Sequence, residues 1–159
     1  MLIVADSSAL VALAICQCLH LLDDLFKDVN VPQSVYDEVV VPNKPEAKIL
    51  RNYLERKIAS IDLTGFIIDI GGLGRGELEE MALYKKLRAD FLLVDDKRAR
   101  KVASLNDIEI IGSQGVLLFA KQQGLIKKIK PFIDKLRSSD IYVNERLIKK
   151  TLRLAKEAD

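Results

Sequence analysis

The sequence predicts an α/β fold, a three-layer sandwich in which helices cover both faces of a mostly parallel sheet. Short apolar runs alternate with longer segments of helical periodicity, which is the pattern of βα units. Two of these runs, residues 2–5 and 91–94, end abruptly in carboxylates, at Asp6 and at the pair Asp95 and Asp96. The length of 159 residues suits one domain, since domains commonly have roughly 100 to 200 residues.

The first half of the chain alternates strand and helix signals. Ser7 or Ser8 can cap the helix that follows the first strand, and apolar residues continue this helix to Leu25, so we expect it to be largely buried. Residues 29–31 are a short strand candidate, and Pro32 stands where the next helix begins. A further helix is expected over about 45–57. Residues 58–63 or 66–70 then supply another strand.

The second half continues the alternation. A glycine-rich entry at 71–76 leads into a helix with Glu77 in its first turn, where Glu77 borders the apolar face while Glu79 points away from it and is expected in solvent. The remaining elements are a strand at 91–94, a basic helix at 97–103, a strand at 108–111, a helix that ends at Gly124, and helices at about 131–138 and 144–158. We expect a single domain over 1–159 whose extra C-terminal helices start at about residue 125.

Composition excludes several classes of protein. Hydrophobic residues make up 49% of the chain and charged residues 30%, which is typical of a globular domain rather than a disordered one. The two cysteines, Cys16 and Cys18, are two apart in an expected helix and do not share a face, so we expect no disulfide. With the single His20 they cannot complete a zinc site. The sequence shows no signal-peptide pattern and no membrane-spanning run, and a cytoplasmic location is expected.

Positive charge is concentrated in the last part of the chain. The net charge is only +2, but from Lys121 onward eleven basic residues face five acidic ones. A solvated helix surface is the common explanation for such a bias. The alternative is contact with a nucleic-acid backbone, for which the candidates are Lys127, Lys128, Lys149 and Lys150.

Acidic side chains are the main functional signal. Asp6 and Asp95 or Asp96 follow strands, and in a parallel sheet the ligand crevice lies beyond the carboxyl ends of the strands. Glu38 and Glu77 lie on helix edges that can face the same crevice. Adjacent carboxylates raise one another's pKa, and a hard divalent cation relieves the repulsion. Oxygen ligands without a usable His or Cys indicate Mg²⁺ or Mn²⁺, which can activate water against a phosphodiester.

These residues together resemble the PIN-domain family of metal-dependent nucleases, and within it the VapC-like branch of toxin nucleases from prokaryotic toxin-antitoxin pairs. The resemblance spans nearly the whole chain. It rests on five segments in a fixed order, at residues 6–10, 31–39, 74–77, 92–100 and 111–117.

The resemblance implies a five-stranded parallel sheet in the order 3-2-1-4-5, an acidic pocket that binds Mg²⁺ or Mn²⁺, and cleavage of RNA. It also implies a homodimer and, often, a small antitoxin protein that fills the pocket. Asp6, Glu38, Glu77 and Asp95 match the acidic positions of the family, with Asp96 as an alternative or an addition to Asp95. Ser7 and Ser113 match hydroxyl positions near the pocket.

Other functions fit the sequence less well. An aspartyl phosphohydrolase needs a second Asp two residues after the first, where this chain has Ser8. A phosphate-receiver domain needs paired acids at the first strand and a Lys at the last, whereas here Asp6 stands alone and no Lys directly follows Ile111. Dinucleotide binding needs its glycines directly after a strand, and Gly74 and Gly76 are not clearly preceded by one. A non-catalytic RNA-binding or interaction module with the same fold stays open as the alternative to a nuclease.

Overall fold

A computed structural model of the 159-residue chain describes residues 1–63 and 74–157. Within these residues five strands form one sheet, in which every neighbouring pair is parallel and the order is β3-β2-β1-β4-β5. The strands are β1 (Leu2–Ala5), β2 (Asp28–Pro32), β3 (Ile58–Ala59), β4 (Phe91–Leu93) and β5 (Ile110–Ile111). The predicted α/β class and the strand order 3-2-1-4-5 are confirmed.

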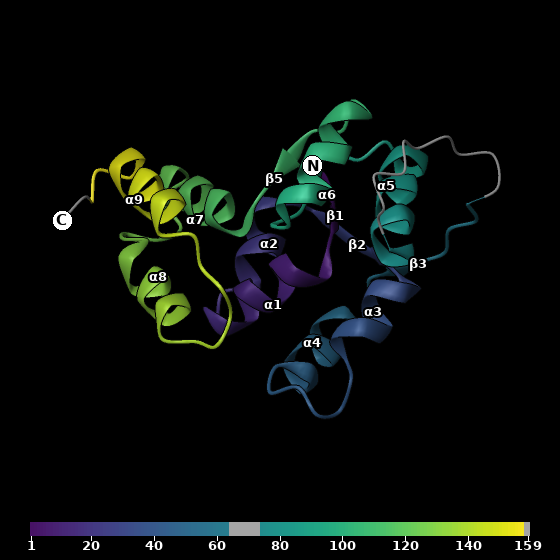
Figure 1. Ribbon diagram of the computed structural model, residues 1–159, viewed down its shortest axis with the longest axis horizontal. Helices are drawn as coiled ribbons and strands as arrows, with labels where there is room; N and C mark the ends of the chain where they lie inside the picture. Colours follow the sequence, from purple (N-terminus) through teal and green to yellow (C-terminus); the bar gives the residue numbers. More distant parts are fainter. Residues whose placement is uncertain (64–73, 158–159) are drawn as a thin grey trace.

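Helices surround the sheet, and Figure 1 shows α7–α9 on one side of the molecule and α3–α5 on the other. The helices are α1 (Ser7–Ile15), α2 (His20–Leu25), α3 (Gln33–Val39), α4 (Ala47–Leu54), α5 (Arg75–Leu87), α6 (Lys97–Leu105), α7 (Ser113–Gln122), α8 (Lys130–Arg137) and α9 (Glu145–Leu154). None of them, within the part of the chain that the structure describes, is long and apolar enough to cross a membrane.

Alternation along the central strands creates two hydrophobic layers. Ile3 and Ala5 of β1 join one cluster with residues of α1, α2, α3 and α7. Val4 between them joins a second cluster, with Leu92 and residues of α5 and α6. Successive side chains of a strand point to opposite faces, so a strand buried on both sides reads as a continuous apolar run. This is why β1 and β4 were recognisable in the sequence.

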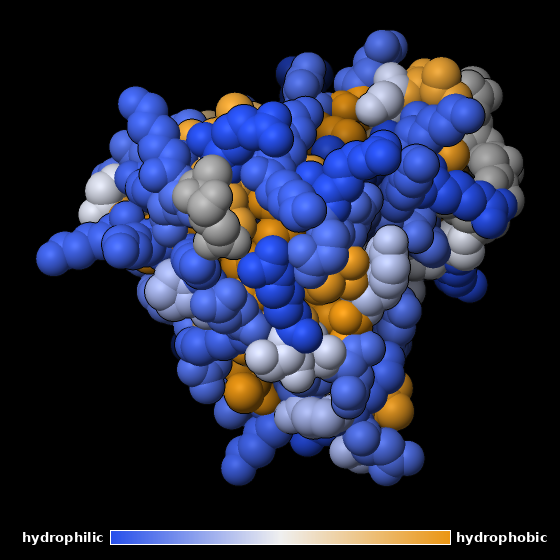
Figure 2. Space-filling view, turned by 60° about the vertical axis from the view of Figure 1, so that its left-hand side comes forward, coloured by the Kyte–Doolittle hydropathy of each residue, from blue (hydrophilic) through white to orange (hydrophobic). Residues whose placement is uncertain are grey.

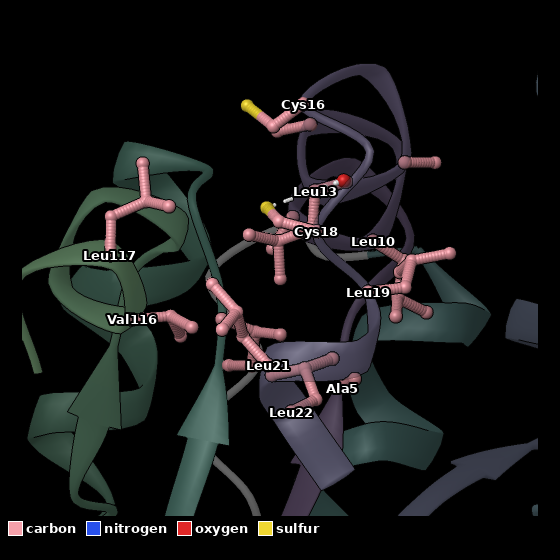
Figure 3. Packing of buried hydrophobic residues seen from close by; sticks show 14 of the residues in the cluster. Ala5, Leu10, Leu13, Cys16, Cys18, Leu19, Leu21, Leu22, Val116 and Leu117 are labelled. Carbon is pink, nitrogen blue, oxygen red and sulfur yellow. Dashed lines mark hydrogen bonds between the residues drawn. The ribbon is translucent and has the colours of Figure 1, made fainter. Parts of the chain in front are cut away.

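The predicted helix from Ser7 or Ser8 to Leu25 is in fact two helices. The chain turns between α1 and α2, where Gln17 has a left-handed backbone with φ of 57°. Cys16 and Cys18 flank this turn as buried, free thiols, and not within one helix as predicted. Figure 3 shows Cys18 donating to the carbonyl of Leu13, at 3.5 Å, among the apolar residues of the core. The apolar pattern runs across the break because both helices are buried.

Other boundaries also differ from the expectation, among them β5, which is shorter than the strand predicted at 108–111, and α9, which is shorter than the helix predicted at about 144–158. The helix predicted at 45–57 is the shorter α4, and the strand predicted at 58–63 is the two-residue β3 at the edge of the sheet. The alternative strand at 66–70 and part of the glycine-rich entry, 71–73, lie outside the described residues. Short edge elements are poorly encoded by periodicity, since few residues repeat the pattern.

The C-terminal helices pack onto the helical layer that contains α1 and α7, because α8 contacts α1 and α9 contacts α7. Gly124, with φ of 78°, follows α7 as expected, and Asn144 caps α9 by accepting from the Leu147 amide. Figure 2, with this side of the molecule turned forward, shows a mostly hydrophilic surface with separate hydrophobic patches. The lysines at 127, 128, 149 and 150 are all exposed.

Candidate active site

Asp6 lies where the central strand meets its helix. The backbone amide of Asp6 donates to the carbonyl of Leu93 at 2.9 Å, so pairing of β1 with β4 continues to this residue. Its carboxylate accepts from the amides of Ser8 at 2.5 Å and Ala9 at 3.5 Å and therefore caps α1. The predicted cap, Ser7 or Ser8, is thus wrong. Asp6 is the cap, because its carboxylate accepts hydrogen bonds from the amides of the first turn.

Burial makes Asp6 an unusually weak acid. The residue is only 4% exposed, and this desolvation raises its pKa to about 7. Hydrogen bonds from Ser8, whose hydroxyl donates at 3.0 Å, oppose the rise, whereas the charge of Asp95 adds to it. The Asp6 carboxylate is therefore held in a dry position beside another carboxylate, which disfavours its charged form.

Asp95 and Asp96 have different roles although they are neighbours. Asp95, half-buried, accepts from both the amide and the hydroxyl of Ser113 at 2.7 Å each. Asp96 is exposed and caps α6 by accepting from the Ala99 amide at 2.8 Å. A Cβ added to Gly112 would lie 3.0 Å from Oδ1 of Asp95, so the glycine makes room for this approach. The amide and the hydroxyl of Ser113 therefore hold both oxygens of Asp95.

Glu38 and Glu77 come from helices on the other side of Asp6. Glu38, on α3, is exposed, and its Oε2 lies 3.7 Å from the position that a Cβ on Gly76 would take. Glu77, in the first turn of α5, is half-buried. Both act electrostatically on one further carboxylate, that of Glu80. The four predicted acids thus share one region, and Ser7 is the half-buried first residue of α1 beside it.

Glu79 is buried, and the prediction that it lies in solvent is wrong. It is 5% exposed, and its two oxygens accept from Nε of Arg75 at 2.6 Å and from Oγ of Ser34 at 2.5 Å. Burial alone would raise the pKa of Glu79, but these hydrogen bonds and the Arg75 charge hold it below its usual range. The side of α5 that carries Glu79 is covered by α3, because α3 packs against α5. Glu79 joins the two helices.

Glu80 is the residue that the sequence analysis missed. It is 1% exposed, and its Oε1 has no hydrogen-bond partner among the residues that the structure describes. Desolvation raises its pKa well above the usual range, and the charges of Asp6, Glu77, Glu38 and Asp96 raise it further. A signal was available in the sequence: Glu80 is three residues after Glu77 and so lies on the same face of the helix.

The donor set fits a divalent cation. Every charged group named as acting on Glu80 is a carboxylate, and oxygen ligands of this kind suit Mg²⁺ or Mn²⁺. Within residues 1–63 and 74–157, no three His, Cys, Asp or Glu side chains already surround a common point closely enough to hold a metal ion. A bound cation would give Oε1 of Glu80 a partner and would favour the charged form of Asp6, whose pKa burial and the Asp95 charge now raise.

Two surface hollows lie away from these acids. One, of about 510 Å³, is lined by residues of α8 and the end of α1, including Gln17 and Lys135. The other, of about 260 Å³, is lined by residues around the turn between α1 and α2, with Ile49 of α4. Neither hollow is lined by any member of the acidic group, which comprises Asp6, Glu38, Glu77, Glu80, Asp95 and Asp96.

Comparison with known families gives one finding that covers almost the entire chain. A family model described as a PIN domain matches residues 2–157. A comparison with curated proteins gives no match.

Proposed function

This chain belongs to the PIN-domain family, and from that premise we propose that it is a divalent-metal-dependent ribonuclease that hydrolyses phosphodiester bonds of RNA. PIN domains are generally nucleases, and PIN nucleases generally use divalent metals. The observation that carries the proposal for this chain is the group of carboxylates around Asp6 and Glu80, which strands and helices distant in sequence bring close enough to raise one another's pKa.

The residues proposed to hold the cation, Mg²⁺ or Mn²⁺, are Asp6, Glu38, Glu77 and Asp95, with Asp96 as an addition or alternative to Asp95. When bound, such an ion lowers the pKa of a water molecule and neutralises charge on the phosphate group. The protein orients its own groups in advance. The amides at the start of α1 hold Asp6, and Ser113 holds Asp95. Burial keeps bulk water from Asp6, which strengthens electrostatic interactions there.

The biological role that we propose is the toxin of a prokaryotic toxin-antitoxin pair, acting on RNA in the cytoplasm. The support is the sequence resemblance to the VapC-like branch, which also suggests a homodimer and a small antitoxin protein as partners. We further propose that residues 1–159 work as one nuclease domain, with the exposed lysines at 127, 128, 149 and 150 contacting the RNA backbone. Growth arrest on expression of the wild type, and none with an inactive variant, would support the toxin role.

The test uses Asp6→Asn. Asn is as good a helix cap as Asp, so the variant keeps α1 while it removes one ligand charge. Asp24→Asn is the matched control, because Asp24 is exposed on α2. It precedes β2 and so lies toward the amino ends of the parallel strands, whereas Asp6 follows the carboxyl end of β1. Mg²⁺ and Mn²⁺ are titrated calorimetrically into each protein, and each is then incubated with a structured RNA.

We expect Asp6→Asn to weaken metal binding and to reduce cleavage by about a hundredfold or more, since even outer-shell partners of metal ligands contribute 10- to 100-fold. Asp24→Asn should match the wild type. Cleavage that persists in Asp6→Asn would remove Asp6 from the mechanism. A wild type that neither binds metal nor cleaves RNA would favour the non-catalytic module.

A further inference from the structure

Glu80 is a buried acid on α5, and one of its oxygens has no hydrogen-bond partner in the part of the chain that the structure describes. It is 1% exposed, and Oε1 makes no hydrogen bond to any residue within 1–63 and 74–157. Its neighbour Glu79 is buried to a similar degree, yet Glu79 binds Arg75 and Ser34 with its two oxygens. The same helix therefore presents two buried carboxylates, of which one is satisfied by the protein and one is not.

The surroundings of Glu80 show what kind of partner is missing. The charges acting on it come from Asp6 after β1, Glu38 on α3, Glu77 on α5 and Asp96 before α6. All four are carboxylates, so none can neutralise a fifth. A buried charge is costly unless it is paired or coordinates a metal. Glu80 is also more deeply buried than Asp6, with an exposed fraction of 1% against 4%.

We propose that Glu80 is a further ligand of the divalent cation, which it contacts from the buried side of the site. The inference rests on the proposed function and adds to its residues a ligand that the resemblance does not supply. The more exposed Glu38, Glu77 and Asp96 approach the ion from the solvent side. Glu80 supplies an oxygen where little space is open to water. The ion thereby links α5 to the end of β1, through Glu80 and Asp6.

The test compares Glu80→Gln with Glu79→Gln, which changes the adjacent buried glutamate in the same way. Mn²⁺ and Mg²⁺ affinities are measured by calorimetry, and melting temperatures are measured in a chelator and in excess Mn²⁺. We expect Glu80→Gln to melt at the same or a higher temperature without metal, because a buried unpaired charge has been removed. Its metal affinity should fall by about tenfold or more, and its gain in melting temperature on adding Mn²⁺ should shrink.

Glu79→Gln should show the opposite pattern. It loses charged hydrogen bonds to Arg75 and Ser34 and should melt at a lower temperature, while its metal affinity stays within about twofold of the wild type. If Glu80→Gln does not fold, Glu80→Asp decides the question, since it keeps the charge but withdraws the oxygens by one methylene. We expect Glu80→Asp to bind Mn²⁺ more weakly than the wild type.

The outcomes separate this inference from the proposed function. A wild type that binds metal and cleaves RNA, with Glu80→Gln or Glu80→Asp equal to it in metal affinity, would overturn the role of Glu80 and leave the nuclease intact. If Glu80→Gln lowers the melting temperature equally with and without Mn²⁺, and leaves the metal affinity unchanged, Glu80 serves only the packing of the protein. A wild type that binds no metal would overturn both proposals.

Discussion

Two regions of this protein bury carboxylates and treat them in opposite ways. At the C-terminal end, Glu157 accepts from Nζ of Lys121 at 2.8 Å and from the amides of Ile129 at 2.9 Å and Lys130 at 3.2 Å. Burial would raise the pKa of Glu157, but these contacts hold it below its usual range. At the acidic edge of the sheet, burial raises the pKa of Asp6 to about 7.

The difference is one of partners rather than depth. Glu157 ties the end of the chain to the start of α8, and its charge is compensated by the protein itself. At the acidic edge, Oε1 of Glu80 has no hydrogen-bond partner among the described residues, and the charges of Asp6, Glu77, Glu38 and Asp96 act on this side chain. Buried charges that the fold satisfies stabilise structure, whereas charges that the fold leaves unsatisfied mark sites where an external ligand supplies the partner. The comparison can be tested from both sides.

The largest expected effect is the pH dependence of the metal-free protein. Asp6 binds its proton more tightly when folded, with a pKa of about 7 against 3.8 unfolded. Between these values the folded state holds more protons, so the free energy of unfolding falls as pH rises from about 4 to 7. The loss is up to about 4 kcal/mol, since each pKa unit corresponds to 1.36 kcal/mol. Denaturant unfolding in a chelator at several pH values measures it.

Asp6→Asn is the control for this prediction and should flatten the slope, leaving the part that Glu80 contributes. Excess Mn²⁺ should also flatten it in the wild type. Below about pH 4 the trend reverses, because the lowered pKa of Glu157 and Glu79 makes protonation of these groups destabilising. A stability that rises steadily from pH 5 to 7.5 in the chelator would contradict an uncompensated acidic edge.

The second effect concerns the other region. Glu157→Ala leaves Lys121 without its carboxylate and removes the acceptor of two amides. We expect the free energy of unfolding to fall by about 2 kcal/mol, in the range of hydrogen bonds to charged groups. Metal affinity should not change. Equal losses of stability with and without Mn²⁺ would confirm that this carboxylate is structural, and a changed affinity would show that the two regions are coupled.

A smaller effect is expected from Ser113→Ala, which removes the hydroxyl bond to Asp95 but keeps the bond from the Ser113 amide. Asp95 should be less well oriented, with cleavage reduced about tenfold and stability lowered by only about 1 kcal/mol. Initial rates at saturating Mn²⁺ provide the measurement. Ser138→Ala is the control, because Ser138 is exposed at the C-terminal end of α8. This variant should cleave RNA at the wild-type rate.

The smallest effect tests whether the C-terminal helices contact RNA at all. Each phosphate neutralised on a single strand contributes about −0.7 to the slope of log affinity against log salt. Lys149→Ala should therefore make the salt dependence of RNA binding shallower by about 0.7, without any effect on metal affinity. An unchanged slope would assign Lys149 to solubility. Binding assays with the catalytically impaired Asp6→Asn variant avoid cleavage during the measurement.

The central framework could be predicted from the amino-acid pattern. The strands at β1 and β4 are encoded by continuous apolar runs, because both faces of each are buried, and the carboxylates that follow them had to emerge at one edge of the sheet. Periodicity also located the long helices α5 and α7. Asp6, Glu38, Glu77 and Asp95 could be named as candidates because their positions depend on local geometry at the end of a strand or on the edge of a helix.

The tertiary structure alone decided which acids are buried and what satisfies them. Glu79 and Glu80 are adjacent and chemically identical. Helical spacing places Glu80 on the face of Glu77 and Glu79 on that of Arg75, but it does not show that both are buried or that Ser34 binds Glu79. The bond to Ser34 depends on α3 packing against α5, a contact between segments some 40 residues apart. The break between α1 and α2 is of the same kind. Burial and pairing are set by neighbours distant in the chain, and local patterns do not contain them.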